Sequence, residues 1–224
     1  MYQEMNRRSE YESERQTLRD RIRETTVQAI LSAAEEVFAD EGFHAARMGA
    51  IAAKAGVSVG TVYNHFEDRD ALLGGLLVSH RAELIERIDH AIAEGASGPL
   101  RERLRGIVSA FLGHCEQHRK FVNLALQQEL GRFQQTYPQA WAKKADTMQA
   151  IYERVDGEMK RGVKERALRP EMAELAAAFF IGMMRALIVR DLLLAKGQGM
   201  AAELDGLLDM FFDGAGAGPR RGAT

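Results

Sequence analysis

The chain has little of what secreted, disulfide-stabilised or membrane-spanning proteins need. Its 224 residues include a single cysteine, Cys115, which excludes an internal disulfide and agrees with a reducing compartment. No apolar run reaches the length of a membrane span, because Arg185 interrupts the longest one, residues 175–189. The charged N-terminal residues lack the apolar core of a signal peptide. We therefore expect a cytoplasmic protein without a membrane partner.

Recognisable catalytic motifs are also missing. The sequence contains no phosphate-binding glycine loop, no HExxH and no nucleophile elbow, and the glycine-rich segment GAGAGP near its end lacks the strand-to-helix setting of a nucleotide fingerprint. An enzyme that uses Cys115 as a nucleophile is an alternative, which requires a thiolate and an adjacent base. We predict no enzymatic activity and no cofactor.

Strand signals are scarce, and the chain is predicted to be all-α. Its β-branched residues are scattered, and no turn dipeptide separates alternating apolar runs. Between Val27 and Phe38 apolar residues instead recur at the spacing of a helix with one buried face. Pro138 and Pro170 stand where helices are expected to begin. The same patterns predict later helices near residues 68–94, 99–117, 120–135, 138–166, 171–196 and 201–213.

The segment IAAKAGVSVGTVYNHF, residues 51–66, carries the pattern of two short helices joined by a tight turn. Gly56 can adopt the positive φ that ends the first helix, and Ser58 can cap the second. In the second helix Val62 and Phe66 are expected to point inward, leaving the intervening side chains exposed. Small residues at the start of that exposed surface allow its backbone to approach a phosphate. The pattern is typical of a helix-turn-helix that binds DNA.

At these residues the sequence resembles the TetR family of bacterial transcriptional repressors. Upstream, AILSAAEEVFADEGF at residues 29–43 is similar to that family's first helix and the glycine turn after it. Downstream, Tyr63, Phe66, Arg69 and Leu72 resemble the family's Y-x-x-F-x-x-K-x-x-L junction into a long fourth helix. The resemblance covers about residues 22–77. It implies an N-terminal three-helix helix-turn-helix domain, joined by a long helix to a C-terminal helical domain for ligand binding and dimerisation.

The chain departs from the family's pattern where the second helix begins. It has Ala46 and Arg47 in place of the usual hydroxyl residue, so Arg47 is expected to contact phosphate by charge. In the recognition helix Tyr63 is expected to hold a phosphate, whereas Thr61 and Asn64 are candidates for base edges. The full set of predicted DNA-contacting residues is Arg47, Lys54, Ser58, Gly60, Thr61, Tyr63, Asn64, His65 and Arg69.

The net charge of −2 argues against a generally basic nucleic-acid coat. Local placement of charge decides phosphate contact, however, and Arg47, Lys54 and Arg69 are expected on or beside the DNA-binding face. We expect the acids Glu35, Glu36 and Asp40 on the opposite side of the first helix. A net negative charge is therefore compatible with operator binding.

The first 13 residues alternate in charge, which favours a frayed arm. A minor-groove arm that uses Arg7 and Arg8 is the alternative, although neighbouring glutamates oppose it. We predict four segments: a flexible arm over residues 1–13, a helix-turn-helix DNA-binding domain over 14–68, a helical effector-binding and dimerisation domain over 69–213, and a flexible tail over 214–224.

The penultimate helix carries two apolar stripes, more than one buried face needs. One stripe includes Phe179 and Met183, and the other includes Phe180 and Met184. One is expected to face the core and the other a second copy of the chain, in a four-helix bundle across a two-fold axis. Burial of both within a monomeric core is the alternative. The predicted dimer interface consists of Phe179, Met183, Leu187, Leu204, Leu208, Phe211 and Phe212.

A ligand cavity is predicted where aromatic residues, methionines and a few polar groups are mixed, as in adaptable apolar sites. Ordinary core is the alternative, but the TetR resemblance implies an inducer between these helices. A small hydrophobic or amphipathic effector is expected. Arg185 requires an acidic partner, such as Glu129, or an anionic ligand. The predicted effector-binding residues are Phe111, Cys115, Phe121, Leu124, Gln128, Trp141, Met148, Tyr152, Phe180 and Met184.

Two histidines, His114 and His118, lie one helical turn apart and are both potential metal ligands. No further ligand cluster in the sequence completes a tetrahedral site, and the helix dipole also favours histidines near a helix C-terminus. The sequence therefore predicts no metal site.

Together these features predict a homodimeric repressor that binds a near-palindromic double-stranded DNA operator and is released from it by a small-molecule effector. An all-α small-molecule carrier or sensor without operator binding is the alternative, because the acidic residues of the N-terminal domain and the missing hydroxyl cap weaken the DNA-binding hypothesis.

Overall fold

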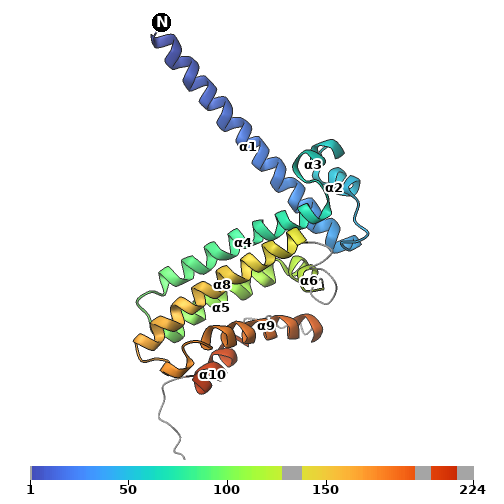
Figure 1. The fold of residues 1–224 in the computed structure, drawn as a ribbon. Helices are drawn as coiled ribbons and strands as arrows, with labels where there is room; N and C mark the ends of the chain where they lie inside the picture. The colour runs from blue at the N-terminus through green and yellow to red at the C-terminus, as the bar shows by residue number, and fades with distance from the viewer. Residues whose placement is uncertain (1, 128–137, 195–202, 216–224) are drawn as a thin grey trace, which may run out of the picture. The chain divides into compact units, whose positions relative to one another are not determined.

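The computed structural model describes residues 2–127, 138–194 and 203–215, and side chains for 17–124, 146–191 and 203–214. These residues form helices and turns without a strand, which confirms the predicted all-α fold (Figure 1). None of the helices in these ranges is long and apolar enough to cross a membrane. The chain divides into two compact units, Met1–Leu76 and Leu77–Thr224, so the division lies inside helix α4 rather than at the predicted position after residue 68.

The N-terminal unit contains α1 (Tyr2–Glu41), α2 (Met48–Ala55), α3 (Val59–His65) and the beginning of α4 (Arg69–Glu94). Helix α1 includes the stretch for which the sequence predicts a flexible arm, and it ends before Gly42, whose φ is +81°. The predicted apolar face is confirmed, because Ile30, Leu31, Ala34 and Phe38 are buried. This face packs against α2, which positions the helix-turn-helix on α1.

The turn between α2 and α3 is formed as the sequence predicts. Gly56 adopts φ +69° and donates its N–H to backbone carbonyls at the end of α2. Ser58 caps α3 by accepting a hydrogen bond from the backbone N–H of Thr61 at 3.0 Å. Val62 is fully buried and Phe66 half-buried. A side chain at Gly75 of α4 would lie only 2.8 Å from the Phe66 ring, so this glycine allows a close approach of α4.

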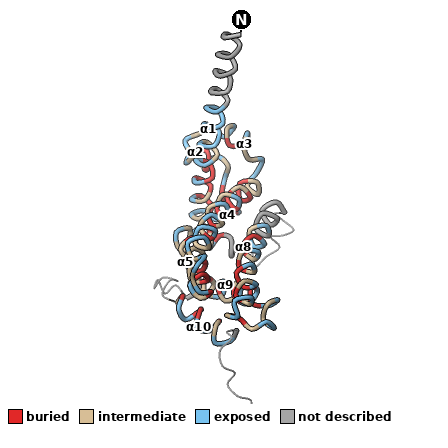
Figure 2. The backbone as a smooth tube through the Cα atoms, turned by 90° about the vertical axis from the view of Figure 1, so that its left-hand side faces the viewer, coloured by how far each residue is buried: buried red, intermediate tan, exposed pale blue. Residues whose placement is uncertain are grey.

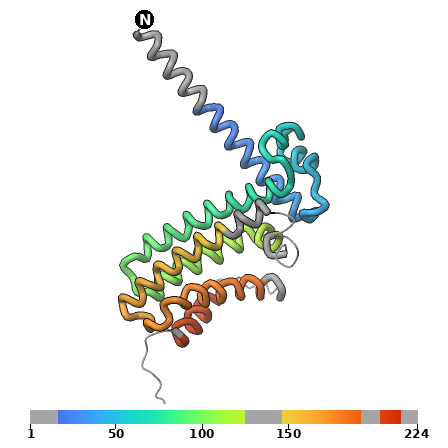
Figure 3. The backbone as a smooth tube through the Cα atoms, in the orientation of Figure 1, coloured from blue at the N-terminus to red at the C-terminus, as the bar shows by residue number. Residues whose placement is uncertain are grey.

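The C-terminal unit is a helical bundle in which α5 packs against α8, α9 and α10, and α9 also packs against α8 and α10 (Figures 1 and 3). Pro138 is the first residue of α8, as predicted, whereas Pro170 opens a short 3-10 turn and the penultimate helix begins only at Ala176. Its elements after α4 are α5 (Leu100–Gln117), α6 (Arg119–Gln127), α8 (Pro138–Lys164), η2 (Pro170–Met172), α9 (Ala176–Leu194) and α10 (Leu204–Ala215).

The core of this unit lies on the inner faces of its helices, where the buried residues gather (Figure 2). Helix α10 contributes Leu208 and Phe211, and the Phe211 ring packs edge-on against Phe180 of α9 at a centroid distance of 5.0 Å. The prediction that Leu204, Leu208 and Phe211 cover a dimer partner is therefore wrong, because these side chains are buried within one copy of the chain.

A charged side chain, Arg103, is also buried in this unit, with only 1% of its surface exposed. Its Nε donates to Glu158 at 2.5 Å, one Nη donates to the carbonyl of Gly98 at 2.7 Å, and the other donates to Glu165 at 2.8 Å. The hydrogen bond from Arg103 lowers the pKa of Glu165 below its usual value. Arg103 therefore joins α5 to the end of α8 in a network that the sequence did not reveal.

Candidate DNA-binding surface and ligand cavity

Helix α3 presents a polar, exposed surface, as expected for a recognition helix. Tyr63 is 53% exposed, and Gly60 and Asn64 are also exposed. Thr61 and His65 are half-buried, which is less exposure than the sequence predicts. The exposed phenol and amide can donate and accept hydrogen bonds with phosphates or base edges.

The hydroxyl of Thr61 is held at the start of α3. Its Oγ1 lies 2.8 Å from the Ser58 hydroxyl, while the Ser58 oxygen also accepts the Thr61 backbone N–H. The two predicted DNA-contacting residues therefore form one small network that both caps the helix and fixes the orientation of the Thr61 side chain. Fixed donors lose less conformational entropy when they bind.

The predicted basic contacts have structural partners. Lys54 forms an ion pair with Glu36 at 2.7 Å, so Glu36 does not lie on the far side of α1 from the predicted DNA-binding face. Arg69 donates to the backbone carbonyls of Phe43 and Ala46, at 3.1 and 3.4 Å, and its guanidinium lies over the Phe43 ring. Arg69 therefore ties the start of α4 to the α1–α2 connection, a role that the sequence did not indicate.

Arg47 occupies the N-cap position of α2, and its side chain makes no capping hydrogen bond there. The side chain is exposed. Its phosphate contact and those of the other predicted residues stay predictions.

The C-terminal unit contains a mainly apolar cavity of about 350 Å³, near the lower end of the usual size for ligand sites. Of the predicted effector-binding residues, Phe111, Cys115, Phe121, Met148 and Met184 line it. The other predicted residues differ: Leu124 and Phe180 are buried, Tyr152 packs against the core, and the side chains of Gln128 and Trp141 lie outside the described residues.

The cavity also has polar lining residues outside the predicted effector-binding set, among them Arg185, for which the sequence predicts an acidic partner or an anionic ligand. His80 and Arg81 come from α4, His114 from α5 and Arg185 from α9. Leu77 and Leu84 of α4 also line the cavity, and His80 and Arg81 lie between them at helical spacing. This spacing is the sequence pattern that could have placed His80 and Arg81 in the cavity wall. Apolar walls with two arginines suit a molecule that has a hydrocarbon part and an anionic group.

The chemistry of Cys115 does not support the alternative of a cysteine-dependent enzyme. The side chain is buried, and burial raises the pKa of its thiol to about 12. A thiol with such a pKa is protonated at neutral pH and is a poor nucleophile. Cys115 therefore acts as an apolar part of the cavity wall.

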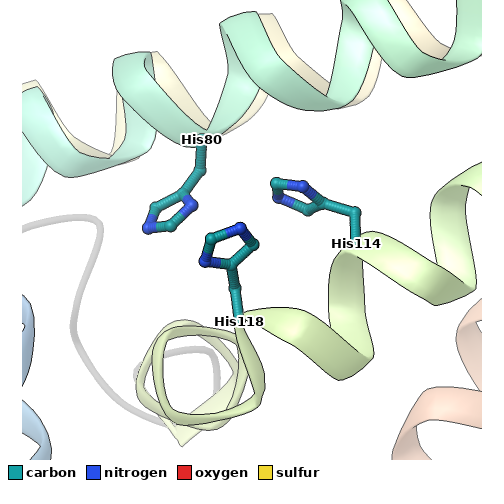
Figure 4. Close-up of side chains that lie close together, drawn as sticks. All are labelled: His80, His114 and His118. Atoms are coloured by element: carbon teal, nitrogen blue, oxygen red, sulfur yellow. The ribbon is translucent and has the colours of Figure 1, made fainter.

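Three imidazoles meet beside this cavity. His80 of α4 faces His114 and His118 of the α5 C-terminal region, and one nitrogen from each ring lies within 4.8 Å of the others (Figure 4). The sequence showed only the His114 and His118 pair, because the third histidine is 34 residues earlier and reaches it only through the packing of α4 on α5. The prediction of no metal site assumed that no further ligand lies near this pair. That assumption is wrong, because His80 lies beside it.

Residues 30–76 match the family model described as bacterial regulatory proteins, tetR family. The chain is 39% identical over 87 residues to the HTH-type transcriptional activator FasR of Mycolicibacterium smegmatis, a match that covers 39% of each protein. It is 35% identical over 80 residues to the fatty acid metabolism regulator protein of Bacillus subtilis, covering 36% of this chain and 40% of the relative. These matches thus span about two fifths of each relative's length.

The fold of the whole chain has solved counterparts. The transcriptional regulator FadR of Bacillus subtilis, solved in complex with stearoyl-CoA, is similar with a TM-score of 0.72 and 21% sequence identity. The match covers 82% of this chain and 96% of that protein. At this identity the likeness establishes the shared fold.

Proposed function

We infer that this chain, whose residues 30–76 place it in the tetR family of bacterial regulatory proteins, is a DNA-binding transcriptional regulator of the cytoplasm. The observation that carries the proposal is the exposed surface of α3, where Tyr63 and Asn64 project from a capped helix that is anchored by buried Val62. Such a surface fits the major groove, with Tyr63 on a phosphate and Asn64 on a base edge. Titration with operator DNA tests the proposal.

The regulator acts as a homodimer on a near-palindromic operator, because two recognition helices related by a two-fold axis contact two half-sites. The partner-facing surface includes the stripe of α9 that the core leaves exposed. Phe179 is 57% exposed, Leu175 before α9 is 53% exposed, and Met210 of α10 is 73% exposed. The backbone N–H of Phe179 bonds to the carbonyl of Leu175, so these two exposed apolar side chains lie one turn apart. Neighbouring exposed apolar side chains of this size favour an oligomer interface.

Replacing Phe179 with glutamate is expected to raise the dimer dissociation constant about tenfold or more, because a carboxylate would be buried at the interface. Analytical ultracentrifugation over a concentration series measures the change. Val78→Glu is the matched control, since Val78 is a similarly exposed apolar residue, 45%, on α4. An unchanged dimer constant for Phe179→Glu would remove Phe179 from the interface.

We propose an amphipathic acid with a hydrocarbon chain, such as a fatty acid or its CoA ester, as the effector that releases the repressor from DNA. The apolar lining supports a hydrocarbon chain, and Arg81 and Arg185 support an anionic group. The neighbour solved with stearoyl-CoA and the relative named for fatty acid metabolism favour the same class.

Blocking the cavity is expected to weaken effector binding without unfolding the protein. Gly182 lines the cavity, and a Cβ there would meet no atom within 4 Å, so Gly182→Trp has room to fill the space. We expect at least about a tenfold loss of affinity for a series of fatty acids and acyl-CoAs, measured by calorimetry. Gly157→Trp is the control, because Gly157 is an exposed glycine of α8 that does not line the cavity. Equal affinities for the two variants would place the effector elsewhere.

The alternative, a small-molecule carrier, would bind its ligand in the same cavity but would not bind operator DNA. Effector binding without specific DNA binding would favour it. The exposed polar residues of α3, in a segment that matches a family of regulatory proteins, favour the regulator.

A further inference from the structure

The cluster of His80, His114 and His118 lies within the C-terminal unit, on α4 and at the end of α5 (Figure 4). The first two side chains are buried and the third is half-buried. The imidazole rings face one another, with centroids 4.5 Å apart for both pairs that involve His118. The Nδ1 of His114 is buried and has no hydrogen-bond partner. A buried polar nitrogen without a hydrogen-bond partner lowers the stability of the fold, so its presence requires an explanation.

A carboxylate lies beside two of the three imidazoles. Glu83 lies one turn after His80 on α4, and its Oε2 is 3.1 Å from Nε2 of His118. Its Oε1 is 3.8 Å from Nδ1 of His114. Two atoms bound to one zinc ion at about 2.0–2.1 Å and a tetrahedral angle lie about 3.3–3.4 Å apart. The carboxylate oxygens therefore lie within a few tenths of an ångström of the distance from His114 and His118 that a shared metal requires.

The chemistry of these side chains suits a metal. Imidazole nitrogens and a carboxylate oxygen are ligands that borderline divalent ions such as Zn²⁺ prefer. Ligand nitrogens that lie up to 4.8 Å apart must approach one another by at most about 1.5 Å to reach the separation in a zinc site, which side-chain rotation can provide.

We propose that His80, His114, His118 and Glu83 bind one divalent transition-metal ion of the zinc class per chain. Because His80 and His114 also line the cavity, the ion forms part of the cavity wall. Arg87 donates to Glu83 at 2.6 Å and orients the carboxylate from outside the ligand set. All four ligands belong to the C-terminal unit, so metal binding can be measured without operator DNA.

The test is a Zn²⁺ titration of the metal-free, untagged full-length protein in competition with a chromogenic chelator. We expect one zinc per chain. His118→Ala removes a half-exposed ligand and is expected to lower the affinity at least about 100-fold, and Glu83→Gln about 10–100-fold. His90→Ala is the matched control on α4, because His90 is 73% exposed and pairs with Glu94 outside the cluster. Its affinity is expected to equal that of the unmodified chain.

A spectroscopic measurement on the unmodified chain keeps the test independent of variant folding. Co²⁺ in place of zinc is expected to give the visible d–d absorption of a four-coordinate centre, and stoichiometric Zn²⁺ is expected to remove it. Absence of this spectrum together with no stoichiometric zinc binding overturns the proposal. The proposal is also overturned if His118→Ala and Glu83→Gln bind zinc with the same affinity as His90→Ala.

Discussion

Tyr63→Glu is expected to weaken operator binding about 100-fold or more. Tyr63 is exposed on α3, and the proposed position of its hydroxyl is on a phosphate. The substitution removes this hydrogen bond and places a carboxylate against the phosphate backbone, and a like-charge contact at an interface costs several kcal/mol. Fluorescence anisotropy with labelled operator at fixed salt measures the loss, because the dissociation constant depends steeply on salt.

Two further variants separate the hydrogen bond from the charge. Tyr63→Phe keeps the ring and is expected to cost only about 0.5–1.5 kcal/mol, equally on all sequences. Ser32→Glu adds the same charge at an exposed position of α1 that belongs to no predicted DNA contact, and we expect little change. If Tyr63→Glu binds as well as Ser32→Glu, the phosphate backbone does not lie at Tyr63.

Arg103→Met is expected to lower the free energy of unfolding by about 3–5 kcal/mol. The substitution leaves the Glu158 carboxylate, which is 7% exposed, without its charged partner in the core. Breaking a buried ion pair from one side costs more than the pair contributes, because the remaining charge stays desolvated. Urea unfolding followed by circular dichroism gives the difference in free energy.

The neighbouring Arg101→Met is the control for Arg103→Met. Arg101 is partly exposed and pairs with the exposed Asp209, a type of ion pair that contributes at most about 1 kcal/mol. The double variant Arg103→Met with Glu158→Leu is expected to recover part of the lost stability, since it removes the uncompensated charge. Equal losses for Arg101→Met and Arg103→Met would show that burial of Arg103 does not matter.

The local features of the fold could be predicted because their causes are local. Gly56 and Ser58 determine the turn of the helix-turn-helix through backbone conformation and capping, and both are found as predicted. The helical spacing of the apolar residues in α1 likewise determines its buried face. Such patterns depend on residues within one or two turns of each other, so the sequence displays them directly.

Features that depend on packing between distant segments could not be predicted in the same way. The sequence cannot show that Phe211 packs on Phe180 rather than on a second copy, because both arrangements bury the same apolar side chain. It cannot show that His80 joins His114, because the contact depends on the register of α4 against α5. Arg103 reads as an ordinary surface residue until Glu158 and Glu165 are brought to it from α8 and the turn after it.

Competition between operator and non-specific DNA tests most directly whether α3 reads the DNA sequence. A near-palindrome is first selected from random DNA with the purified full-length chain, and its half-sites are expected about 34–36 Å apart from centre to centre. Titration at physiological salt is then expected to give at least about 10³-fold tighter binding to this sequence than to a scrambled duplex. Asn64→Ala is expected to relax the preference at one symmetric pair of positions by about 1–3 kcal/mol. Equal affinity for the selected and scrambled duplexes, unchanged by Asn64→Ala, would contradict the account and favour a carrier.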